Sequence, residues 1–147
     1  CDGVAIEPHA DRSRDFKAVD NCYLGIIDPD NSRRIDWRVL PPHPDLPRYR
    51  MAATGAGDSV WFFGGSENPY NYNGVGYNGE PSVPADGALL YHVPSGMWGK
   101  MRINGTPTMD HRGLLRAGDR LITIGGMVDG QIVTSDVFAY RVMGVAD

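Results

Sequence analysis

A short pattern occurs twice in this chain, 61 residues apart: Ala-Gly-Asp, an apolar run and then Gly-Gly. The first copy spans residues 56–65 and ends in VWFFGG, and the second spans residues 117–126 and ends in LITIGG. Gly-Asp before an apolar run is typical of a tight hairpin turn, and a run of this length suits a β-strand. Because the whole pattern recurs, the sequence predicts successive copies of one β-rich unit.

The rest of the chain also favours β-structure, because apolar residues alternate or cluster in short runs and no segment has convincing helical periodicity. Turn residues at 28–31, 94–96 and 129–130 separate some of these runs. Too few residues remain between the runs for crossover helices, so the strands are expected to be antiparallel. The predicted strands are 22–27, 37–40, 49–54, 59–63, 88–93, 99–103, 113–116, 121–124 and 137–142.

The repeat divides these strands into three groups. A complete unit is predicted at 48–103, a partial unit at 111–142 and another partial unit at 22–40. Residues 22–147 thus form the repeat region, whereas residues 1–21 are polar and are expected to be a loop without clear strand character. The alternative is a β-sandwich in which the Gly-Gly pairs recur by accident.

The units resemble the Kelch repeat of β-propellers, in which Gly-Gly closes the second strand, Tyr ends the third and Trp lies in the fourth. The resemblance is carried by Gly64, Gly65, Tyr91, Trp98, Gly125, Gly126, Tyr140 and Trp37. It implies an all-β fold of four-stranded antiparallel meander sheets, or blades. Since propellers close with about four to eight blades, this chain is expected to form an incomplete ring. The remaining blades would come from a second chain fragment or from a homo-oligomer.

Within this arrangement, residues 1–21 occupy the connection between the second and third strands of a blade, which places Cys1 next to Cys22. A Cys1–Cys22 disulfide is therefore predicted, with two free cysteines as the alternative. A disulfide, and a first residue that is not Met, favour a secreted or periplasmic protein. Cys1 is also where a bacterial lipoprotein would carry its anchor, although a fragment boundary is the favoured interpretation of this start.

Charge and hydropathy argue against two classes of partner. The chain has 147 residues and a net charge of −4 at pH 7, which disfavours a nucleic acid bound through a basic surface. No apolar run approaches the roughly 18 residues of a membrane-spanning helix, so no transmembrane segment is predicted.

The long connections of a propeller of this kind lie at one end of the ring, and here they are 1–21, the proline-rich 41–47 and the loop 66–86. The loop 66–86 contains NPYNYNGVGYN. Tyr, Asn and Gly together are typical of binding surfaces, because they combine rigid aromatic area with adaptable hydrogen bonds. The alternative is an ordered loop that packs on its own tyrosines. The candidate ligand-binding residues of this loop are Tyr70, Tyr72, Asn73, Tyr77 and Asn78.

Four further candidates precede the innermost strands and are expected near the mouth of the central channel. They are Arg48, Arg50, His111 and Arg112. Arg recognises carboxylate or phosphate groups through paired hydrogen bonds. The structural alternative is that these arginines pair with a turn Asp or with backbone carbonyls.

Motifs for catalysis do not occur in the sequence. The histidines lack metal-ligand spacing, and there is neither a GxSxG nucleophile elbow nor a phosphate-binding loop. We therefore expect no catalytic residue, metal site or cofactor, and a module that binds a protein, peptide or glycan through its long-loop face. The alternative implied by the resemblance is part of a galactose-oxidase-like or sugar-epimerase-like enzyme whose site is completed by other blades.

Overall fold

The structure, a computed structural model, describes residues 1–111 and 113–141. In these residues nearly all regular structure is strand, arranged in antiparallel sheets that do not close into a barrel, so the predicted all-β class is confirmed. No helix in the described residues is long and apolar enough to span a membrane. A single turn of 3-10 helix, η1 (Asp129–Gln131), separates β11 from β12. The strands are β1 (Gly3–Pro8), β2 (Arg14–Val19), β3 (Tyr23–Ile27), β4 (Ile35–Val39), β5 (Ala52–Ala56), β6 (Ser59–Phe63), β7 (Ala88–His92), β8 (Met97–Met101), β9 (Leu115–Ala117), β10 (Arg120–Ile124), β11 (Met127–Val128), β12 (Ile132–Val133) and β13 (Val137–Arg141).

Strands β5 to β8 form a four-stranded meander in which each strand pairs with the next one along the chain. Successive side chains of β6 point to opposite faces of this sheet. Trp61 and Phe63 join the core cluster on one face, and Phe62 joins the cluster on the other. Because both faces are covered, β6 has a continuous apolar run from Val60 to Phe63 rather than an alternating pattern. The sheet has the antiparallel order expected of a propeller blade.

The second copy of the repeat has the same backbone as the first. β9, β10 and β13 pair in that order, as β5, β6 and β7 do. Gly57 and Gly118 begin the two equivalent turns with φ of 58° and 59°. Two-residue hairpin loops favour glycine at such a left-handed position. The two sheets pack face to face, and the rings of Phe63 and Tyr140 meet edge to face with centroids 5.0 Å apart.

The segment 1–21, predicted to be a loop without strand character, contains a hairpin instead. β1 pairs with β2 along its whole length, and Arg12, with φ of 71°, lies in the turn between them. Charged and small residues mask the strand pattern here, because most of the hairpin is exposed on both faces. The structure therefore corrects the expectation for this segment.

Two smaller departures occur near the repeat. The strand predicted at 49–54 begins only at Ala52, because Arg50 has φ of 58° and interrupts the extended backbone. Tyr49 forms an isolated bridge with Ser66 instead. β11 and β12 form a small hairpin after the second Gly-Gly pair, in a connection where no strand was predicted.

The predicted disulfide between Cys1 and Cys22 is present, with the two Cα atoms 4.0 Å apart. It joins the residue that precedes β3 to the first residue of the chain described here. The disulfide therefore closes the base of the β1–β2 hairpin.

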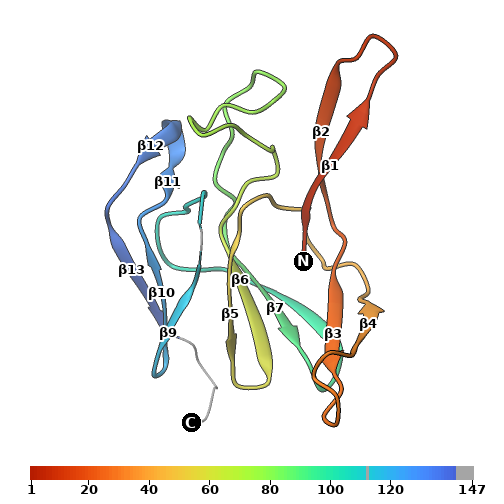
Figure 1. The fold of residues 1–147 in the computed structure, drawn as a ribbon. Helices are drawn as coiled ribbons and strands as arrows, with labels where there is room; N and C mark the ends of the chain where they lie inside the picture. The colour runs from red at the N-terminus through yellow and green to blue at the C-terminus, as the bar shows by residue number, and fades with distance from the viewer. Residues whose placement is uncertain (112, 142–147) are drawn as a thin grey trace.

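The longer connections gather at one end of the molecule, at the top of Figure 1. The β1–β2 hairpin, the loop 66–86 and the β11–β12 hairpin project there, whereas the β5–β6 and β9–β10 turns lie at the other end. Segments far apart in the sequence thus form a common surface at this end, as was predicted for the N-terminal segment and the loop 66–86.

Candidate functional site

An open groove of about 520 Å³ lies where three segments meet at this end. β2 contributes residues 16–18, the proline-rich segment contributes Leu46 and Pro47, and the loop 66–86 contributes residues 67–69 and Asn78. A volume in this range is typical of ligand sites in proteins. The groove is therefore the candidate functional site.

An aromatic pair holds the β1–β2 hairpin against the loop beside this groove. The rings of Phe16 and Tyr77 stack with centroids 4.1 Å apart. Ala18, on the same face of β2 as Phe16, is buried, while Tyr77 keeps 41% of its surface exposed. A stacked pair contributes about 1 kcal/mol beyond the area that it buries. The hairpin and the loop are thus fixed relative to one another.

The opposite wall is ordered by the side chain of Asn68. Its Nδ2 donates to Asn78 Oδ1 at 3.1 Å and to the backbone carbonyl of Glu80 at 3.2 Å. The backbone carbonyl of Asn68 accepts a hydrogen bond from Ser82 Oγ at 2.9 Å. Gly76 is needed beside it, because a Cβ there would overlap the Asn68 amide. The loop is therefore held together by hydrogen bonds between its own polar groups.

A second hollow of about 380 Å³ continues from the groove along residues 81–86 of the loop. Glu67 and Asn68 line both hollows. Together the two hollows are lined by the two ends of the loop, residues 66–69 at its start and 78, 81 and 83–86 toward its end, so their shape suits an elongated ligand better than a compact one.

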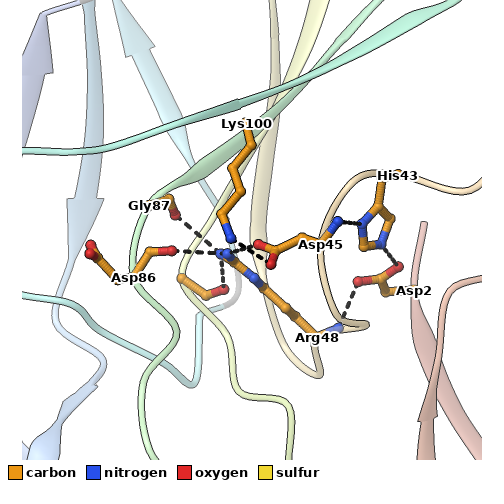
Figure 2. Close-up of polar contacts among 8 residues, drawn as sticks. Asp2, His43, Asp45, Arg48, Asp86, Gly87 and Lys100 are labelled. Carbon is orange, nitrogen blue, oxygen red and sulfur yellow. Dashed lines mark hydrogen bonds and ion pairs between the residues drawn. The ribbon is translucent and has the colours of Figure 1, made fainter.

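A buried polar network, whose Asp45 and Arg48 flank the groove residues Leu46 and Pro47 in sequence, joins the two ends of the loop 66–86 (Figure 2). Arg48 is 2% exposed. Its guanidinium donates to the carbonyl oxygens of Gly64 at 3.3 Å, Asp86 at 2.9 Å and Gly87 at 3.1 Å. Gly64 precedes the loop 66–86, Asp86 ends it and Gly87 follows it, so Arg48 fixes the base of the loop.

Asp45 is the counter-charge of Arg48 in this network. Lys100 Nζ donates to its other carboxylate oxygen at 2.7 Å. Burial by itself would raise the pKa of Asp45, but the hydrogen bond from Lys100 and the charge of Arg48 outweigh it, and the pKa lies below its ordinary value. Asp45 is therefore ionised at neutral pH and holds both cations.

Asp2 connects the network to the N-terminal hairpin. One carboxylate oxygen accepts the Arg48 backbone N–H at 2.7 Å, and the other lies 2.8 Å from His43 Nε2. His43 Nδ1 accepts a hydrogen bond from the Asp45 N–H at 3.3 Å. The ring N–H is therefore on Nε2, which donates a hydrogen bond to Asp2. Because the adjacent disulfide anchors the N-terminus, it also holds Asp2 in this position.

A second polar and aromatic cluster lies on the loops that precede β5 and β9. Arg50 donates to Asp110 at 2.7 Å, and its guanidinium lies over the rings of Tyr49 and Tyr70, 4.9 Å and 5.2 Å from their centroids. Tyr70 is fully buried, and burial raises the pKa of its hydroxyl. The Arg50 and Asp110 side chains are about one quarter exposed, so solvent reaches the charged part of this cluster.

His111 lies between the two Gly-Gly pairs. A Cβ at Gly64 would be 3.0 Å from Cδ2 of the imidazole, and a Cβ at Gly126 would be 3.0 Å from Cε1. The ring Nε2 is 2.7 Å from Thr108 Oγ1. Burial lowers the pKa of His111. The ring is therefore packed between the sheets and does not face the surface.

Four of the predicted ligand-binding residues are exposed on the loop 66–86. Asn78 lines the groove, and Tyr77 stacks on the groove residue Phe16. Tyr72, which is 89% exposed, and Asn73 lie on the same loop but do not line the groove.

The other predicted ligand-binding residues are placed differently. Arg48, Tyr70 and His111 are buried, and Arg48 has the pairing with Asp and carbonyl groups that was the alternative to ligand binding. Arg50 belongs to the cluster on the loops before β5 and β9. Arg112 lies outside the described residues.

Sequence analysis missed Phe16 and Glu67 in the groove and Asp2 and Asp45 in the Arg48 network, and it included Asn68 only as part of the candidate segment 68–78. The available signal was Phe16, the one aromatic residue in a polar N-terminal segment. Among the described residues, no group of three or more His, Cys, Asp or Glu side chains is placed to hold a metal ion.

No protein-family model and no curated protein matches this chain. Among solved structures 56 chains match, so the fold is a recurrent one. One of them, the structure of YjhT, superposes with a TM-score of 0.68 at 20% sequence identity. The match covers 87% of this chain and 37% of YjhT. At this identity the likeness shows the fold alone, and this chain spans little more than a third of the length of the protein that it resembles.

Proposed function

We propose that this chain is part of a Kelch-type β-propeller that binds a protein, peptide or glycan in the groove at its long-loop end. The observation that carries the proposal is the groove itself, formed by three segments, one of which continues from Pro47 directly into the buried Arg48. Because that network and the loop's own hydrogen bonds fix the walls, little ordering entropy is lost on binding.

Two predicted residues have roles in this groove. Tyr77 supplies a rigid aromatic surface next to Phe16. Asn78 Oδ1 accepts from Asn68 Nδ2 and from the Glu80 backbone N–H, both at 3.1 Å. These contacts use the oxygen of the Asn78 amide and leave its Nδ2 group to donate to a ligand.

A binding screen tests the proposal. The purified chain is screened against a glycan array and a displayed peptide library, and each hit is titrated by calorimetry. Tyr77→Ala is expected to weaken binding by about tenfold, the loss of one aromatic contact. Tyr72→Ala is the matched control, because Tyr72 is an exposed tyrosine of the same loop that does not line the groove. A ligand whose affinity is unchanged by Tyr77→Ala contradicts the proposal, and so does a screen that finds no ligand.

The proposed ring consists of blades at 22–40, 48–103 and 111–142 together with further blades from another polypeptide or another copy of the chain. The β3–β4 hairpin supports this arrangement. Three cross-strand pairs place Tyr23, Ile27, Ile35, Trp37 and Val39 on one face, with Trp37 64% exposed. Neighbouring sheets in this fold cover each other's faces, as β5–β8 and β9–β13 do. An additional sheet would bury this apolar face in the same way.

Light scattering combined with denaturing mass spectrometry tests the ring. We expect a defined oligomer, or a second polypeptide that co-purifies with the chain. Trp37→Asp places a charge on the β3–β4 face and is expected to dissociate the assembly. A monomer that stays monomeric at high concentration in the wild type contradicts the proposed ring.

The disulfide supports a secreted or periplasmic location, because structural disulfides persist in oxidising compartments. Fractionation of cells that produce the protein, with thiol labelling before and after reduction, tests this. Protein recovered from the cytoplasm with both cysteines free contradicts it.

A second candidate function is part of a galactose-oxidase-like or sugar-epimerase-like enzyme, with a site completed by other blades. The observation that favours it is the Arg50–Asp110 pair, in which two non-glycine residues hold left-handed φ angles beside a buried Tyr70. Strained residues of this kind concentrate at functional sites. Sugar oxidation and anomer interconversion assays on the assembled protein test this, with Arg50→Gln expected to abolish any activity. Activity that survives Arg50→Gln contradicts it.

A further inference from the structure

The outer edge of β2 carries backbone groups that the hairpin does not use. The His9 N–H donates to the Ser13 carbonyl at 2.9 Å. These two residues continue the register of β1 and β2, so the bond shows which opposing residues of the hairpin are hydrogen-bonded to each other. Residues whose N–H and C=O point toward the partner strand alternate with residues whose groups point away. Counting every second residue from Ser13, the backbone groups of Asp15 and Lys17 form hydrogen bonds with β1. The N–H and C=O groups of Phe16 and Ala18 point away from β1.

This outer edge faces the groove. Residues 16–18 line it on one side, and residues 67–69 with Asn78 line it on the other. Figure 1 shows that β2, and not β1, is the strand of the hairpin nearer to the loop 66–86. The backbone edge of β2 and the groove are therefore one surface.

The far wall does not bond to β2. The Asn68 side chain is used within the loop, and the Tyr77 N–H donates to the Pro69 carbonyl at 3.0 Å. A free strand edge next to a groove is the arrangement on which extended peptides add as a further strand.

We propose that the groove binds an extended peptide segment that pairs with the outer edge of β2. The inference rests on the proposed binding function and narrows its ligand class. Donor and acceptor groups at Phe16 and Ala18 repeat every second residue, which matches the period of a peptide backbone and not that of sugar hydroxyls. Alternate side chains of the peptide then pack on the Phe16–Tyr77 pair and on Leu46 and Pro47.

The shape of the site supports the same ligand class. A strand rises about 3.4 Å per residue, so the edge from Arg14 to Ala18 spans about 14 Å and pairs with a segment of about five residues. The second hollow continues from the groove along residues 81–86, which gives the peptide a path beyond the strand pairing.

Two proline variants separate edge pairing from other modes of binding. Val4 and Ala18 are opposite one another in the hairpin, and the N–H groups of both point outward, at opposite edges. Proline at either position removes an N–H that the β1–β2 pairing does not use, so the hairpin is retained. Ala18→Pro removes a donor at the groove, and Val4→Pro is the matched control. Thermal unfolding of both variants checks that each one folds.

The probes are octapeptides selected from a random phage-displayed library on the 147-residue chain and then synthesised. Ala18→Pro is expected to weaken their binding by about tenfold, the loss of one backbone hydrogen bond without compensation, and Val4→Pro to leave it unchanged. In the wild-type protein, bound peptide is expected to slow amide hydrogen exchange at Phe16 and Ala18. This second measurement needs no variant.

Peptides that bind without protecting the Phe16 and Ala18 amides overturn the inference, as does a selection that enriches no peptide. The proposed function has a separate outcome. A glycan that binds in the groove and is lost in Tyr77→Ala, with no peptide bound, leaves the binding function intact and removes the peptide ligand class. Absence of both kinds of ligand overturns both proposals.

Discussion

Arg50 donates a 2.7 Å hydrogen bond to Asp110 while both residues hold left-handed backbone angles, with φ of 58° and 61°. The two residues precede neighbouring sheets, on the loops before β5 and β9. A residue with a Cβ in this conformation costs about 1–2 kcal/mol, so the surrounding structure offsets this strain at both positions. The ion pair and the stacking of Arg50 on Tyr49 and Tyr70 are the contacts that do so.

The strain at Arg50 can be measured by two substitutions. Arg50→Ala and Arg50→Gly both remove the ion pair and the stacking, but only glycine relieves the backbone strain. We expect Arg50→Ala to be less stable than Arg50→Gly by about 1 kcal/mol in urea unfolding. Equal stability of the two variants would show that the residue carries no strain.

The Gly-Gly pairs make a second prediction. At Gly64, φ is 66° and a Cβ would overlap the Thr108 carbonyl oxygen; at Gly118, φ is 59° and a Cβ would meet no atom within 4 Å. We expect Gly118→Ala to cost about 1 kcal/mol, the cost of the conformation alone. Gly64→Ala is expected to cost at least about 3 kcal/mol, because the carbonyl must also move. Similar unfolding midpoints for the two variants would contradict the close approach of the backbone at Gly64.

His111 predicts a pH dependence of stability. Because burial lowers its pKa below the ordinary value of about 6.5, the unfolded chain binds a proton more readily than the folded protein. Stability from this group is therefore fully present above about pH 6.5 and is lost as the pH falls toward the lower folded pKa. His111→Gln should reduce the slope of unfolding free energy against pH between about 7 and 5. An unchanged slope in this variant would assign the dependence to other groups.

The disulfide predicts a change in stability on reduction. Its two cysteines are 21 residues apart in sequence, and closing a loop of this size stabilises the folded state by about 3 kcal/mol in the chain-entropy model. We expect dithiothreitol to lower the unfolding free energy by that amount. A variant with both Cys1→Ser and Cys22→Ser should unfold with the same midpoint with and without reductant. An unfolding free energy of the wild-type protein that does not change on addition of reductant would contradict the prediction.

The repeat made much of the fold predictable, because a turn, a strand and Gly-Gly are local features that recur in the sequence. The Cys1–Cys22 pairing followed from the same repeat. The β1–β2 hairpin was not predictable in this way, because an exposed hairpin needs no apolar face and its residues carry a weak pattern.

Sequence analysis placed all three groove-lining segments at one end of the ring, but among them it named candidate binding residues only in the loop 66–86. Tyr77 and Asn78 belong to a composition typical of binding surfaces, whereas Phe16 reaches the groove through a hairpin that sequence analysis did not detect. Arg48 shows a different limit. An arginine beside a channel mouth and an arginine that caps three carbonyl groups have the same sequence signature, and only the positions of Gly64, Asp86 and Gly87 separate them.

One imidazole touches both copies of the repeat. The Cδ2 edge of His111 lies against Gly64 in the first copy, and the Cε1 edge lies against Gly126 in the second. A side chain at either glycine would press on the ring as well as on a backbone carbonyl, that of Thr108 at Gly64 and that of Met109 at Gly126. His111 acts as a spacer between them, and its ring occupies the room that glycine leaves at both positions. The two copies of the repeat are thereby coupled through a single side chain.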